Sequence, residues 1–341
     1  MLLALRRSFD IWSASVFTLA VVIFCPILSL IYLSFGDSEG LWAHLLESVL
    51  ARYVSTTVAL MVGVSCLTLL FGVTTAWIVA AYQFRFSKLL DMVILLPIAC
   101  PAYLVAYAYT DFFEYAGPVQ GALRDMMGWK TARDYYFPEI RSLGGAIFVL
   151  SSVLYPYVYL LSRTAFRHIP SSFYEVAAIS NRNVFWNICL PLARPAIVAG
   201  LALVCMEVVS DFGTVEFFSL ETLTLGIFNV WIGMNNITAA AQISTFTFIF
   251  IILLLLTEMY SRSRKRFNDT SRKQTVAKPK IVTGFKAVLL YVVCLTPVIF
   301  GFVTPAAILL WNVVKSTDLA AFRAVVDVLQ NSLFIATLGA G

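Results

Sequence analysis

Apolar residues run along this chain in stretches of about 20 or more, separated by shorter polar connections. Each stretch is long enough to cross the hydrocarbon core of a bilayer, which is about 30 Å thick. Because that core holds no water to satisfy backbone groups, a stretch that crosses it must be helical. The sequence therefore predicts an all-α polytopic membrane protein. The predicted spanning helices lie at 11–35, 54–82, 89–113, 143–163, 192–215, 241–260 and 287–312, and an eighth helix starts near 329.

The composition narrows the class of protein further. The chain is 60% hydrophobic and 13% charged, with a mean hydropathy of +0.86, far outside the range of ordinary globular domains. The first apolar run is too long for a signal peptide and lacks a small-residue cleavage site, so we expect it to span. No Cys-x-x-Cys pair occurs, and five of the six cysteines lie in apolar runs. They are typical of small buried side chains, which argues against a disulfide framework or a metal site.

The positions of Lys and Arg predict the orientation of the helices, because short connections rich in these residues stay cytoplasmic. Every second connection is basic, and the remaining ones, 36–52, 114–142 and 216–240, are mixed or acidic. The basic residues concerned are Arg6, Arg7, Arg85, Lys88, Arg163, Arg167 and Arg182, followed by a dense cluster within 262–286. The amino terminus is therefore predicted to be cytoplasmic, and so is the loop 171–195.

The connection 261–286 is polar, strongly basic and without helical periodicity. This pattern is typical of a linker lying near an anionic membrane leaflet. An orientation signal is the simplest interpretation of its charge. A nucleic-acid interface is a poorer one, because nothing in the segment predicts a fold that would present the charges.

The segment after this linker resembles the segment that opens the chain. Each contains an apolar run with one internal proline, Pro26 in the first and Pro305 in the second. Further along, Ser55-Thr56 and Gly63 match Asn331-Ser332 and Gly339 in the same order. A weak repeat of this kind is typical of transporters built from duplicated units.

The repeat predicts three parts. Residues 1–260 form a first permease-like unit of six helices, 261–286 form a basic cytoplasmic linker, and 287–341 begin a second, repeated unit that is incomplete. From about 329 to the last residue a helix would be roughly 20 Å long, too short to span. We therefore expect the chain to be a fragment of a longer protein. The alternative is a naturally short protein with a re-entrant end, which would leave helix carbonyls in lipid unless something covered them.

The cytoplasmic loop is predicted to fold into two short helices. Pro170 ends the preceding helix, and Ser172 with Glu175 forms a Ser-x-x-Glu capping box, so a helix is expected to begin at Phe173. Asn181 is a suitable left-handed stop for it. A second helix over about 183–190 is then expected to end before Pro191.

Within this loop, Glu175, Ala177, Ala178 and the ending Leu190-Pro191 resemble the EAA loop of binding-protein-dependent (MetI-like) ABC importer permeases. Asn181 stands where that loop usually carries glycine, and the distance from Glu175 to Pro191 is about three residues short of the usual one. The resemblance implies that the loop couples to the groove of a cytoplasmic ATPase. Glu175 is expected to cap its helix and also to take part in that contact. The implied coupling residues are Ser172, Glu175, Ala177, Ala178, Asn181, Leu190 and Pro191.

Two further segments resemble the ferric-iron permeases of this superfamily. One runs from Pro97 through Tyr103, Tyr107 and Asp111 to Pro118, and the other runs from Glu207 through Asp211 to Asn236. The resemblance covers essentially all of 10–341. It implies an inner-membrane protein of bacteria, fed with ferric iron by a periplasmic binding protein.

The residues in these segments suit a hard cation. Fe³⁺ prefers carboxylate and phenolate oxygens, which the segments supply in abundance. The candidate path residues are Glu207, Asp211, Asp111, Tyr107 and Tyr109. Glu207 and Asp211 are four residues apart and are expected to share one helical face. Buried acids in spanning helices face a cavity or a polar partner. A structural bond to the Tyr-rich third helix is the favoured role for Glu207, and the path is the favoured place for Asp211.

Tyr103 and Tyr107, with the kinking prolines Pro97 and Pro101, offer material for a gate, although ordinary packing explains them equally well. The sequence has no Gly-x-x-x-x-Gly-Lys-Ser/Thr loop, so ATP hydrolysis is expected in a partner and no cofactor is expected on this chain. The expected partners are an ATPase dimer, a periplasmic binding protein and the bilayer, without nucleic acid. The alternatives are import of thiamine, a polyamine or another cation, an ion-driven secondary transporter, and a membrane enzyme. No nucleophile–base set supports the last.

Overall fold

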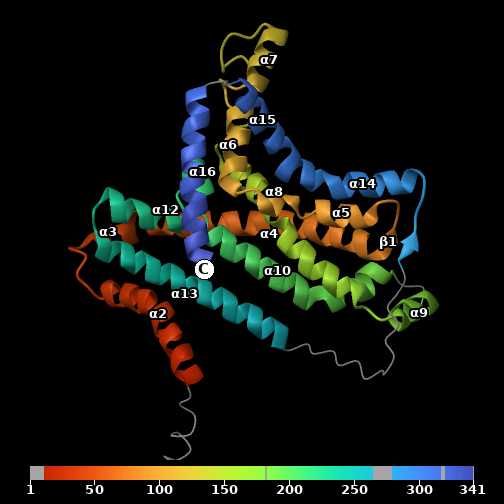
Figure 1. Cartoon of the computed structure of the whole chain (residues 1–341), viewed down its shortest axis with the longest axis horizontal. Coiled ribbons are helices and arrows are strands. Elements are labelled where there is room, and N and C mark those ends of the chain that lie inside the picture. The colour runs from red at the N-terminus through yellow and green to blue at the C-terminus, as the bar shows by residue number, and fades with distance from the viewer. Residues whose placement is uncertain (1–10, 181–182, 264–278, 316–318, 341) are drawn as a thin grey trace, which may run out of the picture.

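The computed structural model describes residues 11–180, 183–263, 279–315 and 319–340, and these form an almost wholly helical molecule (Figure 1). Its elements are α2 (Ile11–Ser34), α3 (Leu41–Ser48), α4 (Leu50–Ala81), β1 (Tyr82–Gln83), α5 (Ser87–Val93), η1 (Leu96–Ala99), α6 (Ala102–Phe113), α7 (Pro118–Met127), α8 (Leu143–Arg167), α9 (Ser171–Ile179), η2 (Phe185–Cys189), α10 (Leu190–Ser210), α11 (Gly213–Phe217), α12 (Leu223–Phe228), η3 (Asn229–Gly233), α13 (Ile237–Ser263), β2 (Lys280–Ile281), α14 (Phe285–Val298), η4 (Ile299–Val303), α15 (Thr304–Lys315) and α16 (Leu319–Ala340).

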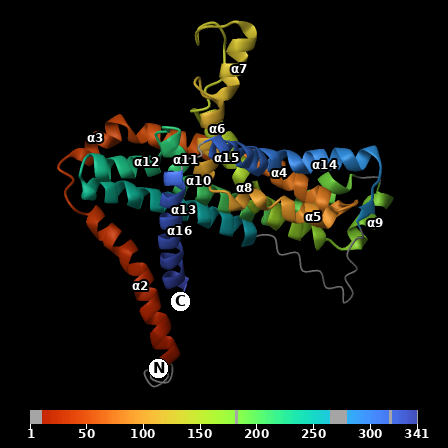
Figure 2. The same ribbon diagram turned by 45° about the horizontal axis from the view of Figure 1, so that its top comes forward.

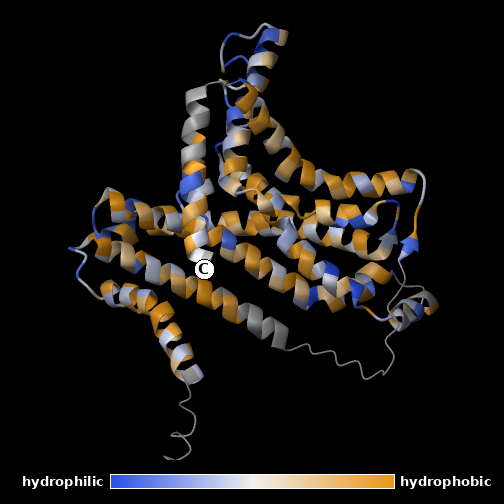
Figure 3. Ribbon diagram, viewed as in Figure 1, coloured by the Kyte–Doolittle hydropathy of each residue, from blue (hydrophilic) through white to orange (hydrophobic). Residues whose placement is uncertain are grey.

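The predicted fold class is confirmed. Among the described residues, five helices are long and apolar enough to cross a membrane: Trp12–Ser34, Leu50–Ala81, Leu143–Arg167, Phe185–Ser210 and Phe285–Lys315. A bent pair of helices makes a sixth if it is counted as one span. The long helices are apolar over most of their surface, whereas the α7 hairpin and the connections near β1 and α9 carry polar residues (Figure 3). This pattern fits a molecule whose long helices face lipid.

Helix α8 forms the centre of the bundle, and its most extensive contacts are with α4 and then with α10. Two glycines allow this packing. A Cβ at Gly72 of α4 would lie 2.7 Å from the Val158 Cβ, and a Cβ at Gly200 of α10 would lie 2.8 Å from the Val158 Cα. Both neighbouring backbones therefore approach α8 around the same residue. Small residues at such crossings are how helices pack closely in membranes, where lipid is as apolar as the side chains.

The prediction of one continuous helix over 89–113 is wrong. Helices α5 and η1 precede a break at Cys100, and α6 and α7 continue at an angle of 83° to them. Pro97 and Pro101 each lack a backbone N–H, so the hydrogen-bond ladder fails twice within four residues. The broken turn is repaired from α8, where the Tyr155 hydroxyl donates to the Ile94 carbonyl at 2.7 Å. Such repair by a neighbouring helix is what permits irregular backbone at membrane depth.

A second irregular turn, η4, joins α14 to α15 and lies against the same centre. A Cβ at Gly301 would fall 2.1 Å from the Ser152 carbonyl oxygen of α8 and 2.9 Å from the Pro97 Cβ. The Tyr109 hydroxyl donates to the Phe300 carbonyl of this turn at 2.6 Å. The two irregular segments and α8 thus meet at one crossing. Each segment has a carbonyl that accepts a hydrogen bond from a buried tyrosine.

The connections predicted to be cytoplasmic gather at one end of the bundle. There β1 pairs in parallel with β2, with Tyr82 opposite Lys280 and Gln83 opposite Ile281, and α9 lies at the same end (Figure 1). Helices α3 and α12 lie at the opposite end, and α7 stands clear of the body (Figure 2). We call the end with β1, β2 and α9 the inner end, and we use outer end for α3 and α12 together with the projecting α6 and α7. Which end faces the cytoplasm stays a prediction.

The parts on either side of the predicted linker are in contact. Helix α14 packs on α4 and α15 packs on α6, so these two helices lie against the first unit. The eighth helix begins at Leu319, ten residues before the predicted start. Most of the linker, residues 264–278, and Arg6 and Arg7 lie outside the described residues. The division into two units stays a prediction.

The glycine packing leads to a first prediction. Replacing Gly200 or Gly72 by Ala places a methyl group against the α8 backbone, so the helices must separate. Overpacking of this kind costs about 1–3 kcal/mol. We expect both variants to unfold at lower temperature than the parent in detergent, as measured by thermal unfolding of the purified protein.

Gly121 supplies the matched control, because a Cβ there meets nothing within 4 Å. Gly121→Ala should leave the unfolding temperature unchanged or raise it slightly, as expected for a helical position where the added methyl group meets no neighbour. Equal unfolding temperatures for all three alanine variants would show that the close approach at Val158 does not limit stability.

Candidate functional site

Helix α6 carries polar side chains on one face at the outer end. Tyr103, Tyr107 and Asp111 follow one another at intervals of four residues and so share a face of the helix. Tyr103 is 51% exposed and Tyr107 is 44% exposed, while Tyr109 on the other face is only 2% exposed. The structure therefore separates the predicted path residues of this helix. Tyr109 is a core residue whose hydroxyl bonds to a backbone carbonyl, and its role on the path stays a prediction.

Two cavities open along this face, and Tyr107 borders both. One, of about 570 Å³, is lined by Tyr103, Leu104, Tyr107, Arg141, Gly213, Glu216 and Phe217. The other, of about 450 Å³, is lined by Tyr107, Asp111, Leu309, Asn312, Val313 and Lys315. We call them the α11 cavity and the α15 cavity. The groups in these cavities that could bind a metal ion are carboxylates, phenols and an amide, whose oxygen and nitrogen atoms are hard ligands.

Contacts between elements define both cavities. Gly213 allows α11 to approach α6, since a Cβ there would lie 3.1 Å from the Tyr103 Cβ. The Tyr107 and Phe217 rings meet edge to face, with centroids 6.1 Å apart. In the α15 cavity the Asn312 amide donates to the Asp111 carboxylate at 2.7 Å. The first cavity therefore lies between α6 and α11, and the second between α6 and α15.

The predicted pair Glu207 and Asp211 is split by the end of α10. The backbone turns extended at Asp211, and its carboxylate accepts hydrogen bonds from the Thr214 and Val215 N–H groups at 3.0 and 3.2 Å. Asp211 therefore holds the start of α11, as a capping residue does. Glu207 is exposed and accepts a hydrogen bond from the Tyr157 hydroxyl at 3.4 Å. Both carboxylates therefore have hydrogen-bond partners, and the favoured place of Asp211 on the path stays a prediction. The partner of Glu207 is on α8 and not on the third helix.

The outer hairpin around α7 is held together by its own polar contacts. Arg124 donates to the Tyr115 carbonyl at 2.8 Å and to the Tyr135 hydroxyl at 3.1 Å, and its guanidinium lies over the Tyr115 ring. Tyr135 in turn donates to Gln120 at 2.5 Å. Backbone N–H groups of Thr131 and Lys130 hold the pKa of Asp134 below its ordinary value. The hairpin borders a third cavity of about 780 Å³.

At the inner end, α9 begins at Ser171, two residues before the predicted start. The Pro170 carbonyl accepts a hydrogen bond from the Phe173 N–H at 3.2 Å, so the first turn is already formed there. Ser172 and Glu175 consequently lie inside the helix, and the predicted capping box is wrong. Asn181, Arg182 and the side chain of Ala178 lie outside the described residues.

The second helix of the loop starts where expected but does not end at Pro191. The Asn183 carboxamide oxygen accepts from the Phe185 and Trp186 N–H groups at 3.0 and 3.3 Å, which caps the start. The helix then widens into the π turn η2, in which the Leu190 N–H bonds to the Phe185 carbonyl, and it continues as α10. A π turn shifts the ladder by one residue, so the helix passes Pro191 without ending. Leu190 and Pro191 therefore belong to a spanning helix.

Aromatic side chains anchor this loop to the bundle. Phe185 packs on Trp77 of α4 and on Phe166 of α8, with ring centroids 5.0 and 6.3 Å apart. On α9, Ala177 is buried, and burial raises the pKa of Tyr174, whose hydroxyl lies 3.6 Å from the Cys189 sulfur. The side of the loop that faces away from the bundle is instead exposed.

Ile179 is 86% exposed and Trp186 is 65% exposed, and Glu175 is exposed between apolar neighbours. The anchored loop therefore leaves three apolar side chains exposed at the inner end, Phe173, Ile179 and Trp186.

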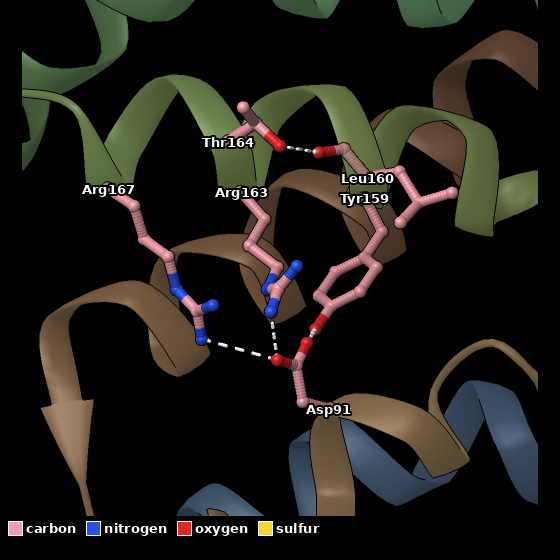
Figure 4. Close-up of polar contacts among 6 residues, drawn as sticks. All are labelled: Asp91, Tyr159, Leu160, Arg163, Thr164 and Arg167. Carbon is pink, nitrogen blue, oxygen red and sulfur yellow. Dashed lines mark hydrogen bonds and ion pairs between the residues drawn. The ribbon is translucent and has the colours of Figure 1, made fainter. Parts of the chain in front are cut away.

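A charged cluster lies beside this loop (Figure 4). Asp91 of α5 accepts hydrogen bonds from the Tyr159 hydroxyl and from Arg163, and Arg167 lies 3.3 Å from the same carboxylate. The side chains of Asp91 and Arg163 are only 15% and 21% exposed. Three donors from α8 thus converge on one carboxylate of the broken third helix. The cluster joins α5 to α8 at the inner end.

Sequence reasoning missed the residues that join elements. Asp91 was not singled out from the sequence. A usable signal existed, because Asp91 lies between a basic connection and an apolar run, and Arg163 and Arg167 lie four residues apart elsewhere in the chain. Arg141 was also missed, because it is one of several cations in an outer connection of mixed charge. Among the described residues, no group of three or more His, Cys, Asp or Glu is placed to hold a metal ion.

Comparison with known proteins places these features in a family. The family described as "Binding-protein-dependent transport system inner membrane component" matches residues 68–266, more than half of the chain. The Fe(3+)-transport system permease protein FbpB 2 of Haemophilus influenzae is 23% identical over 306 residues, covering 85% of this chain and 54% of that protein. A protein of Salmonella paratyphi A that carries the name of a 2-aminoethylphosphonate permease is 28% identical over 52% of this chain and 62% of its own length.

A solved structure shows the same fold. A chain of a bacterial alginate ABC transporter, crystallised with an alginate-bound periplasmic protein, superposes with a TM-score of 0.55 over 74% of this chain and 94% of its own. The sequences are 16% identical, so the likeness concerns the fold alone. The alignments with the two curated relatives span about half to three fifths of those proteins.

The charged cluster leads to a second prediction. Asp91→Asn keeps the shape of the side chain but removes the negative charge that Arg163 and Arg167 share. A hydrogen bond to a charged group is worth about 1.5–3 kcal/mol, and a largely buried arginine would lose its counter-charge. We expect a lower unfolding temperature in detergent than for Asp125→Asn, whose parent carboxylate is exposed on α7. Indistinguishable unfolding curves for the two variants would remove the cluster from the interactions that stabilise the fold.

Proposed function

Since this chain belongs to the family of binding-protein-dependent transport system inner membrane components, we propose that it is a permease subunit of an ATP-driven ABC importer. In this proposal a periplasmic binding protein delivers the solute to the outer end, and a separate cytoplasmic ATPase dimer acts on the inner end. The chain binds no cofactor itself, because ATP is bound and hydrolysed by the partner. The protein lies in the inner membrane of a bacterium, with its amino terminus in the cytoplasm.

The observation that carries the proposal is the anchored loop at the inner end. Its base is buried against Trp77 and Phe166, so a force applied to α9 reaches α4, α8 and α10 directly. On the side that faces away from the bundle, the loop leaves Ile179 and Trp186 exposed, as a docking surface requires. Glu175 is exposed in the same helix and remains the proposed coupling carboxylate. Family membership also supports ATP-driven import over transport driven by an ion gradient.

A charge in this apolar surface should break the contact. We predict that Ile179→Asp lowers co-purification with the ATPase and the ATPase activity stimulated by the binding protein, because an unpaired carboxylate would be buried on docking. Ile281→Asp is the matched control, since Ile281 is 79% exposed at the same end but on β2. If Ile179→Asp retains as much ATPase as Ile281→Asp, the loop is not the coupling surface.

We propose ferric iron as the solute. Support comes from the relationship to an Fe(3+)-transport permease and from the oxygen donors Tyr103, Tyr107, Asp111 and Glu216 around the α11 and α15 cavities. Glu207 remains a proposed path residue, because its side chain is exposed and its hydrogen bond from Tyr157 is long, at 3.4 Å. Asp211 is kept at the edge of the path, where it positions α11. A relative named for 2-aminoethylphosphonate makes import of an oxyanion the second candidate.

Uptake measurements separate these solutes. Deletion of the gene should abolish uptake of radiolabelled ferric iron into cells, and the restored gene should return it. Glu207→Gln should lower uptake severalfold, because a carboxylate on the path stabilises a passing cation. Glu47→Gln on α3, also exposed at the outer end, should not. Loss of phosphonate or sulfate uptake with normal iron uptake in the deletion strain would overturn the iron assignment.

A further inference from the structure

Arg141 lies where three outer segments meet. It follows the outer hairpin and precedes α8, and it borders both the α11 cavity and the hairpin cavity. Its Nε pairs with the carboxylate of Glu114, the residue that ends α6. Its Nη1 donates to the Phe217 carbonyl, at the end of α11, at 3.1 Å. One guanidinium thus joins the ends of α6 and α11. We call the opening between these two helix ends the mouth.

The same side chain also controls an aromatic contact. The guanidinium of Arg141 lies over the Phe217 ring, 4.7 Å from its centroid, and that ring meets Tyr107 edge to face. Arginine combines a planar stacking face with directed hydrogen bonds, which lysine does not. Release of Arg141 would therefore free the Phe217 ring and the end of α11 together.

The position of the pair in water suits an interaction that opens. The side chains of Arg141 and Glu114 are 44% and 41% exposed. The pair Asp91–Arg163 at the inner end is 15% and 21% exposed, and it is also bonded to Tyr159. An ion pair in contact with water is weak and is readily exchanged for other charged groups, whereas a buried one is not.

The charges around the mouth decide which groups can compete with Arg141. The two cavities and the pair bring together the carboxylates of Glu114, Glu216 and Asp111, against the cations Arg141 and Lys315. Glu216 is exposed and takes part in none of the ion pairs between described residues. A cation arriving at the mouth therefore meets an excess of negative charge.

We propose that Arg141 is the outer latch of the path, and that a cationic solute opens it by competing for Glu114. The latch holds α11 against α6 while the mouth is empty. A multivalent cation near Glu114 and Glu216 draws the carboxylate away from the guanidinium, and α11 separates from α6. This inference rests on the proposed permease function.

Thiol labelling tests the latch without any transport. Leu104 lines the α11 cavity, so Leu104→Cys reports how readily the cavity opens to a membrane-impermeant anionic methanethiosulfonate. The parent chain, with its own six cysteines, gives the background rate. In the Leu104→Cys background, Arg141→Ala and Glu114→Gln should each raise the labelling rate at least about threefold, the size expected for loss of a half-exposed ion pair. The double variant should label no faster than Arg141→Ala, because both changes open the same contact.

Another outer pair supplies the control. Arg52 and Glu221 are 3.0 Å apart, with side chains 67% and 47% exposed, and they border neither cavity. Arg52→Ala should leave labelling of Leu104→Cys unchanged. Arg141→Lys keeps the charge, so its labelling rate in the Leu104→Cys background should fall between those of Leu104→Cys alone and of the Arg141→Ala variant. Size-exclusion profiles in detergent confirm that each variant is folded. The latch would be overturned if Leu104→Cys labelled at the same rate with and without Arg141→Ala, or if Arg52→Ala raised that rate as much as Arg141→Ala does.

A trivalent hard cation tests the second half of the proposal. Adding La³⁺ should speed labelling of Leu104→Cys relative to sodium chloride of the same ionic strength, and should have no further effect in Glu114→Gln or Arg141→Ala. The same La³⁺ effect in all three chains would overturn opening by a cation. Because the assay needs neither ATPase nor binding protein, its failure is distinguishable from failure of the coupling test with Ile179→Asp.

Discussion

The close packing of α4 and α10 on α8 is the constraint on which the rest of the molecule depends. Gly72 and Gly200 bring both neighbouring backbones against Val158, so α8 is fixed between them. Lipid provides no hydrophobic force to press these helices together, and only contact at short range holds them. With α8 fixed, its two ends are fixed as well. Arg163 near one end pairs with α5, and Arg141 just before the other end pairs with α6.

The irregular backbone also depends on α8. A helix broken at Pro97 and Pro101 leaves carbonyls without partners, and lipid cannot satisfy them. The Tyr155 hydroxyl reaches one such carbonyl, at Ile94, because α8 is held close enough. Tyr109 serves the irregular turn η4 in the same way. These tyrosines are buried, and their hydroxyl groups bond to carbonyls of irregular backbone.

The two ends of the molecule use arginine differently. At the inner end a largely buried carboxylate collects three donors, which makes a rigid joint beside the loop that we propose as the ATPase contact. At the outer end one guanidinium in contact with water bridges two helix ends. A rigid inner joint transmits force, and a weak outer joint can be exchanged. This difference in burial is consistent with a solute entering from the outer end.

The sequence by itself determined the helical membrane class, most of the spanning segments and the family, because hydropathy and the Glu175-x-Ala177-Ala178 motif are local properties of the chain. It could not decide what Pro97, Pro101 and Pro191 do, since a proline breaks a helix or is absorbed by a π turn according to its neighbours. It also could not show that Tyr109 is buried or that Asp211 holds the start of α11, because spacing gives a helical face but not what that face meets. Only tertiary structure brought Asp91 to Arg163 and Glu114 to Arg141, pairs separated by 72 and 27 residues. Such pairs form through packing of whole helices, so the sequence can indicate the charged residues but not which of them pair.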